Sequence, residues 1–214
     1  MSRTPAPLPT HPDVTIVSKQ RVWSGRFPID VVRFRQRRFD GAISGLRTWE
    51  LWRRGRAAAL LPYDPRTDQV VLIEQFRFPA FAAGVDPVLV ELPAGLLEDG
   101  ETPEVSIARE MQEETRLDAD RLEHIGRFLL SPGGTDEMVE LYAGRVAAPP
   151  AGPDGIAWYA GEPGEDEDIR VRVWSATEAI EAALGGRFTN VVTAVGLLWL
   201  ATRRDWLRQR WGTP

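Results

Sequence analysis

The stretch that decides the fold is GLLEDGETPEVSIAREMQEETRL, residues 95–117. Thr102 is a good N-cap and Pro103 a good first helical residue, so the sequence predicts a helix that begins there and runs to about Arg116. At about 100° per residue, the apolar residues of this helix fall on one face and three carboxylates on another. The carboxylates belong to Glu110, Glu113 and Glu114.

This acidic turn has a simple interpretation as a solvated helix face. Like charges at i, i+3 and i+4 destabilise a helix by no more than about 0.5 kcal/mol per pair, which is tolerable in water. The spacing alone therefore does not decide between a solvated face and a functional site.

The flanking residues favour a functional site. Gly95 stands at a strand-to-loop junction, and Glu101 and Arg109 stand at fixed offsets from the acidic turn. Together these residues resemble the Nudix signature, G-x5-E-x7-R-E-U-x-E-E-x-G-U, where U is a bulky aliphatic residue. The sequence departs at Arg116, which stands where the signature has glycine. We expect this arginine to alter the helix C-terminus and the stability rather than the chemistry.

Composition limits the remaining classes of function. The chain has 214 residues, enough for one large domain or a domain with a smaller appendage, and a net charge of −5 without a long basic run, so we expect no nucleic-acid partner. It has no cysteine and two histidines, His11 and His124, so acid–base work should fall to carboxylates. Residues 1–13 are proline-rich and are interpreted as a loose cytoplasmic arm. The apolar run at residues 191–201 is shorter than the ~20 residues of a membrane span, so we expect no membrane partner.

The rest of the chain alternates short strand-like runs with turns and closes with two helices. A small antiparallel sheet is predicted within residues 14–55, followed by one domain over residues 56–214. Strands are expected at residues 57–63, 69–78, 88–92, 122–130, 139–146 and 169–174, and helices after Ser175 and Asn190. The fold class is therefore α+β. By resemblance it is a Nudix α/β/α sandwich with a mixed sheet, plus an N-terminal antiparallel β-sheet appendage.

The resemblance also implies a metal site on the acidic turn. Converging carboxylates cannot all stay ionised without cost unless cations neutralise them, and Mg²⁺ or Mn²⁺ prefer such oxygen ligands. Arg109 would orient the glutamates, and Glu101 would support the loop beside them. The implied ligands are Glu110, Glu113 (directly or through water), Glu114, the carbonyl of Ala94 and, as a further contact, Glu167.

Segments outside the signature look like the ADP-ribose pyrophosphatase branch of the family. They are GRAAALLPYDPRTDQVVLIEQFRFPA, ELPAGLLEDGE, SPGGTDE and EDEDIRVRVW, in this order. The implied reaction is hydrolysis of ADP-ribose to AMP and ribose 5-phosphate. The alternatives are a pyrophosphatase of nucleotide sugars such as GDP-mannose, and a non-catalytic Nudix domain that senses a nucleotide.

The same resemblance implies roles for residues whose simpler interpretation is structural. Arg77 is either an exposed charge at a strand end or a contact to substrate phosphate or ribose. SPGGTDE is either a glycine turn or a loop over the terminal ribose that carries Glu137. The acidic loop at residues 165–168 is either solvated or carries Glu165 as the general base.

Relatives in this branch form homodimers in which the N-terminal sheet is exchanged and helps to bind adenine. The segment Arg26-Phe27, Trp49 and Trp52 are candidates for stacking in that region, although aromatic residues in strands are more often core. Some relatives carry a basic residue near the position of Trp49, and Arg53, Arg54 and Arg56 are the candidates to compensate for it.

Overall fold

The computed structural model describes residues 5–162, 164 and 167–212. The chain divides into two compact units, each described by itself. Unit 1 contains residues 1–56 and 129–138, and unit 2 contains residues 57–128 and 139–214.

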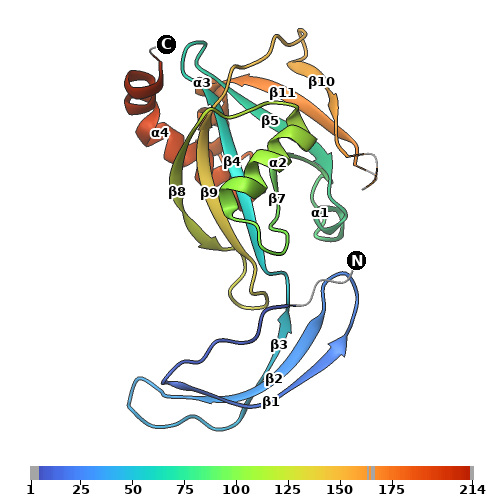
Figure 1. Cartoon of the computed structure of the whole chain (residues 1–214), viewed down its shortest axis with the longest axis vertical. Helices are drawn as coiled ribbons and strands as arrows, with labels where there is room; N and C mark the ends of the chain where they lie inside the picture. Colours follow the sequence, from blue (N-terminus) through green and yellow to red (C-terminus); the bar gives the residue numbers. More distant parts are fainter. Residues whose placement is uncertain (1–4, 163, 165–166, 213–214) are drawn as a thin grey trace. The chain divides into compact units, whose positions relative to one another are not determined.

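Unit 1 is built on a three-stranded antiparallel sheet in the order β1-β2-β3 (Figure 1). Its strands are β1 (Val14–Trp23), β2 (Ile29–Gln36) and β3 (Arg47–Trp52). All ten residues of β1 are exposed, whereas Asp30 and Val32 of β2 are buried. The segment 129–138 belongs to this unit and joins two strands of the larger sheet.

Unit 2 contains an eight-stranded sheet. Six of its strands follow the order β10-β11-β5-β4-β9-β8, and the other two, β6 and β7, pair with β5 and β4. Tyr63 accepts from the backbone N–H of Val146 and Gly55 from that of Met138, so β4 and β9 run parallel within an otherwise largely antiparallel sheet. The elements are β4 (Arg56–Asp64), β5 (Gln69–Phe76), α1 (Phe78–Ala82), β6 (Val88–Glu91), β7 (Ala94–Leu96), α2 (Pro103–Thr115), β8 (Arg121–Leu129), β9 (Met138–Arg145), β10 (Ile156–Ala160), β11 (Ile169–Ser175), α3 (Ala176–Leu184) and α4 (Val191–Trp211).

Helices cover both faces of this sheet because successive side chains of a strand point to opposite sides. On one face, Leu60 of β4 belongs to a buried cluster with Ile107 and Met111 of α2. On the other face, the Cβ of Leu61 lies 3.9 Å from where a Cβ would stand at Gly196 of α4. The three layers in Figure 1 confirm the predicted α/β/α sandwich with a mixed sheet and a separate N-terminal antiparallel sheet.

The elements differ from the prediction in several places, among them the three-residue strand β7, which was not expected. The strand expected to reach residue 78 ends at Phe76, and the short helix α1 begins at Phe78 with Pro79 in its first turn. Proline lacks the N–H that a central strand needs but fits the first turn of a helix, which explains the early end. Strand β10 lies between two polar loops and was not expected from its five residues.

Within the described part of the chain, no helix combines the length and apolar character needed to cross a membrane.

Candidate active site

The acidic turn lies on α2, which is held at both ends. The Thr102 hydroxyl accepts from the backbone N–H of Val105, and Pro103 opens the helix, as expected. At the other end Arg116 is the C-cap, with a left-handed φ of 55°. This is the conformation that a glycine adopts at little cost, so the arginine at the glycine position of the signature carries backbone strain.

Arg109 organises the carboxylates around it. Its Nε donates to Glu101 at 3.0 Å, and Nη1 donates to both Glu110 and Glu113 at 2.9 Å. Nη2 donates to Glu101 at 3.2 Å and to the carbonyl of Leu96 at 3.3 Å. One guanidinium therefore fixes three carboxylates and the strand β7, using the fork geometry that lysine lacks.

Strand β7 lies close against α2 at the acidic turn. The backbone N–H of Ala94 donates to Oε2 of Glu114 at 2.9 Å. A Cβ added at Gly95 would stand 1.7 Å from Oε1 of Glu110, far inside contact distance. Only glycine allows the backbone to approach this carboxylate so closely, which gives a physical reason for glycine at the first position of the signature.

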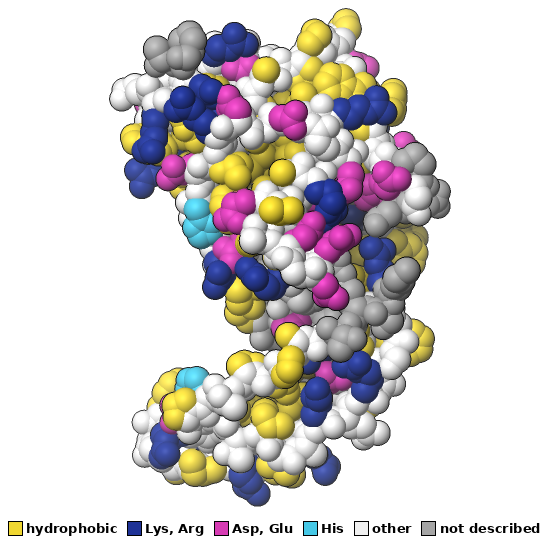
Figure 2. Space-filling model, viewed as in Figure 1, with side chains coloured by type: hydrophobic (Ala, Val, Ile, Leu, Met, Phe, Trp, Pro, Cys, Tyr) yellow, Lys and Arg dark blue, Asp and Glu magenta, His cyan; other side chains and the backbone are white. Residues whose placement is uncertain are grey.

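Burial makes two of these carboxylates reluctant to ionise. It raises the pKa of Glu110 from 4.5 to about 7, even though the Arg109 charge opposes the change. Burial also raises the pKa of Glu114 well above its ordinary value, and the charges of Glu110 and Glu167 act in the same direction. Glu101 behaves oppositely, because its hydrogen bond from Arg109 lowers its pKa. Figure 2 shows acidic side chains gathered over α2 with basic side chains next to them.

The acidic loop reaches this cluster through Glu167. Its carboxylate accepts from Nε2 of Gln75 at 3.5 Å and from the backbone N–H of Glu162 at 3.3 Å. Oε1 of Gln75 is buried and has no hydrogen-bond partner. Glu165, the predicted base, lies outside the described residues.

Arg77 follows β5 and is paired with a buried carboxylate. Its Nε donates to Oε2 of Glu91 at 2.7 Å, and Glu91 also accepts from the side chain of Asn190, the N-cap of α4. The positive charge of Arg77 acts on Glu114, where it opposes the rise in pKa. The sequence interpretation did not single out Gln75 or Glu91, because their partners are 92 and 14 residues away and strand register is needed to bring them together.

The other predicted site residues lie in unit 1. Arg54 and Glu137 form a doubly hydrogen-bonded pair, with contacts of 3.1 and 2.9 Å. The guanidinium of Arg54 lies 4.3 Å from the ring centroid of Phe27. Trp49 is over a third exposed, and its Nε1 donates to the carbonyl of Gly133 at 3.0 Å. The structure thus brings Phe27, Arg54 and Glu137 together and bonds Trp49 to the SPGGTDE loop.

A NUDIX domain model matches residues 53–190 of the chain, which is more than half of its length. The chain belongs to the Nudix family. The ADP-ribose pyrophosphatase of Escherichia coli strain K12 is 39% identical over 199 residues, which cover 93% of each chain. The ADP-ribose pyrophosphatase of Haemophilus influenzae is 36% identical over 203 residues, covering 93% of this chain and 91% of that one.

Two further comparisons bear on substrate and fold. The GDP-mannose pyrophosphatase of Yersinia enterocolitica is 35% identical over 152 residues, covering 71% of this chain and 76% of that one. The crystal structure of an ADP compounds hydrolase shares the fold with a TM-score of 0.63 and 19% identity, covering 96% of this chain and all of that one.

Nudix pyrophosphatases in general use divalent metal ions, and the donor set on α2 has the right chemistry for one. Among the described residues, no group of three or more His, Cys, Asp or Glu side chains already has the arrangement of a metal site. Instead Arg109 holds Glu110 and Glu113, and Ala94 holds Glu114. Buried carboxylates with raised pKa values are the groups that a hard cation would stabilise in their ionised form, so the residues fit the ion.

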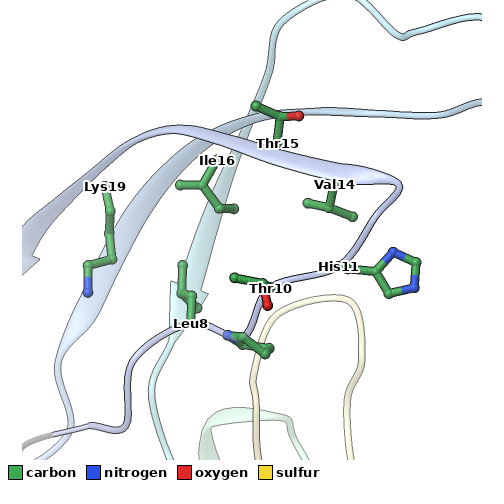
Figure 3. A pocket seen from close by; sticks show the side chains of 8 residues that line it. Leu8, Thr10, His11, Val14, Thr15, Ile16 and Lys19 are labelled. Carbon is green, nitrogen blue, oxygen red and sulfur yellow. The ribbon is translucent and has the colours of Figure 1, made fainter.

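A hollow of about 560 Å³ in unit 1 contains none of the predicted site residues. Figure 3 shows it between the arm and β1, with the ring of His11 directed away from Leu8, Ile16 and Lys19. Its lining is mostly apolar, with a single cationic side chain, and carries no group suited to pyrophosphate chemistry.

Proposed function

We propose that the chain hydrolyses the pyrophosphate of ADP-ribose to AMP and ribose 5-phosphate with Mg²⁺ as its metal ion, Mn²⁺ being able to replace it. The observation that carries the reaction is the cluster of carboxylates that Arg109 organises against β7, where burial raises the pKa of Glu110 to about 7. Two ADP-ribose pyrophosphatases, 39% and 36% identical to this chain, match it over most of their length. These matches support ADP-ribose as the substrate.

The proposed metal ligands are Glu110, Glu113, Glu114, the carbonyl of Ala94 and, from the acidic loop, Glu167. A bound divalent ion supplies charge neutralisation on the pyrophosphate oxygens and lowers the pKa of water. Arg109 keeps Glu110 and Glu113 in a common orientation before any ion arrives, which reduces the reorganisation needed on binding.

The proposed general base is Glu165, assigned by resemblance. Its carboxylate takes the proton from the attacking water as the water oxygen bonds to phosphorus and the bridging oxygen leaves. Glu113 and Glu114, besides binding metal, are proposed to line the position of this water. Arg109 orients Glu113, and the backbone N–H of Ala94 orients Glu114.

Side chains outside the acidic turn are also proposed to contact substrate. Arg77, directed by Glu91, presents a cation suited to a phosphate oxygen. In unit 1, Phe27 and Trp49 offer aromatic faces, and the Arg54–Glu137 pair offers donors and acceptors for a base or ribose.

We further propose that the protein is a cytoplasmic homodimer. The large apolar residues of the N-terminal sheet support this, because Val17, Val22 and Trp23 of β1 are more than half exposed. The proposed division is an arm at residues 1–13, a dimerising and exchanged sheet at 14–55, and a hydrolase domain at 56–214.

GDP-mannose is the second candidate substrate, because a GDP-mannose pyrophosphatase matches 71% of the chain at 35% identity. Purified protein should release AMP and ribose 5-phosphate in equal amounts from ADP-ribose with Mg²⁺, and a chelator should stop the reaction. Glu114→Gln should reduce kcat by at least about a hundredfold, because the variant removes a charged ligand. Normal turnover by this variant would overturn the metal-site assignment, and binding without turnover by the natural chain would favour a sensor.

A further inference from the structure

An ion pair between a buried arginine and a half-buried aspartate ties the SPGGTDE loop to the N-terminal sheet within unit 1. Arg53 is 5% exposed, and its Nε donates to Oδ2 of Asp136 at 2.6 Å. The same guanidinium donates to Asp30 of β2 at 3.2 Å and to the carbonyl of Ala6 at 2.6 Å. One arginine therefore joins the arm, the sheet and the loop.

The second oxygen of Asp136 is occupied as well. Oδ1 accepts from the backbone N–H groups of Arg54 at 2.7 Å and Gly55 at 3.2 Å. The backbone of Trp52 adds two bonds, donating to the carbonyl of Gly134 at 2.9 Å and accepting from the N–H of Asp136 at 3.3 Å. The loop is thus fixed along the end of β3 by side-chain and main-chain contacts.

Each member of this ion pair is followed in sequence by a residue proposed to contact substrate. Arg54 follows Arg53, and Glu137 follows Asp136. Their doubly bonded contact lies against aromatic rings, because the guanidinium of Arg54 is 4.3 Å from the centroid of Phe27 and 4.9 Å from that of Trp52. The orientation of the Arg54–Glu137 pair is consequently coupled to that of the ion pair beside it.

We propose that the Arg53–Asp136 pair is a positioning clamp that sets the orientation of Arg54 and Glu137 for the nucleoside or ribose part of the substrate. The inference rests on the proposed function, which assigns Arg54 and Glu137 to substrate, and adds two residues that act through them. A preorganised pair binds more tightly than one that must be ordered on binding, so the clamp acts on substrate affinity.

Asp136 is the better residue to change. Replacing Arg53 would leave the buried Asp30 with one partner fewer, whereas Asp136→Ala leaves Arg53 bonded to Asp30 and Ala6. Asp136→Asn keeps an oxygen for the two backbone N–H groups and removes the charge. The matched control is Asp13→Ala, which removes an exposed ion pair, with Arg37 at 2.9 Å, from the same unit.

Two measurements test the clamp. Hydrogen exchange of the full-length protein without substrate should show the Arg54 and Gly55 amides exchanging at least about tenfold faster in Asp136→Ala. Steady-state kinetics with ADP-ribose and Mg²⁺ should show KM raised about tenfold with kcat within about threefold of the natural chain. For Asp136→Asn, the exchange rates and KM should lie between those of the natural chain and those of Asp136→Ala. Asp13→Ala should change neither the exchange rates nor KM.

The outcomes separate this inference from the proposed function. If the natural chain does not hydrolyse ADP-ribose, the proposed function fails and the clamp fails with it. If the natural chain turns over normally but Asp136→Ala leaves KM unchanged, or lowers kcat alone, the clamp is wrong and the proposed function stands. Unchanged exchange at both amides also overturns the clamp.

Discussion

Without divalent cations, the protein should lose stability as the pH rises from about 5 to about 8, because Glu110 must ionise in a buried site. Its pKa in the folded protein is about 7, against 4.5 as the ordinary value. Folding therefore favours the protonated form, so the stabilisation is complete below 4.5 and is lost as the pH rises through about 7. The gap between the two values corresponds to about 3 kcal/mol in the free energy of unfolding, and most of this is lost between about pH 5 and about pH 8. The raised pKa of Glu114 acts in the same direction.

Urea unfolding in the presence of a chelator measures this loss directly. In Glu110→Gln the amide cannot ionise, so this part of the loss should disappear. Between about pH 5 and about pH 8, the free energy of unfolding of the variant should fall by about 2 to 3 kcal/mol less than that of the natural chain. Added Mg²⁺ should stabilise the natural chain more at the higher pH, since the ligands must be deprotonated to bind it. Parallel pH profiles for the two proteins would refute the electrostatic reasoning about this site.

Three substitutions extend the test. Gly95→Ala should abolish measurable Mn²⁺ binding and turnover, because the new Cβ displaces the flexible carboxylate of Glu110. The effect on melting temperature should be smaller. A normal Mn²⁺ affinity in calorimetric titration would contradict this prediction. Arg109→Lys should lower kcat at least about tenfold, since lysine cannot bond Glu101 through a two-pronged fork, and a kcat equal to that of the natural chain would argue against this role. Arg116→Gly should relieve the backbone strain of the left-handed conformation and raise the free energy of unfolding by about 1 kcal/mol. The melting temperature should rise while kcat stays unchanged. A large loss of kcat at an unchanged melting temperature would be evidence against this interpretation of Arg116.

Local signals in the sequence were sufficient for the helices. Thr102, Ser175 and Asn190 each accept from a backbone N–H as N-caps, and the three predicted helices begin directly after them. The signature also carries enough spacing information to predict that Glu110 and Glu114 lie together on α2. These features depend on residues near one another in the chain, where helix periodicity fixes the geometry.

Contacts between distant segments were not predictable in the same way. The ion pair of Arg53 with Asp136 joins residues 83 apart, and nothing in either local sequence specifies the partner. The hydrogen bond from Gln75 to Glu167 joins residues 92 apart and depends on the pairing of β5 with β11. Such contacts follow from strand register, which a single sequence leaves open.

The central claim is best tested by measuring kcat/KM of the purified protein for ADP-ribose and for GDP-mannose, each with Mg²⁺ at the same pH, with identification of the products. We expect a clear preference for ADP-ribose, with AMP as the nucleotide product. An equal or higher kcat/KM for GDP-mannose, or no AMP from ADP-ribose, would contradict the account.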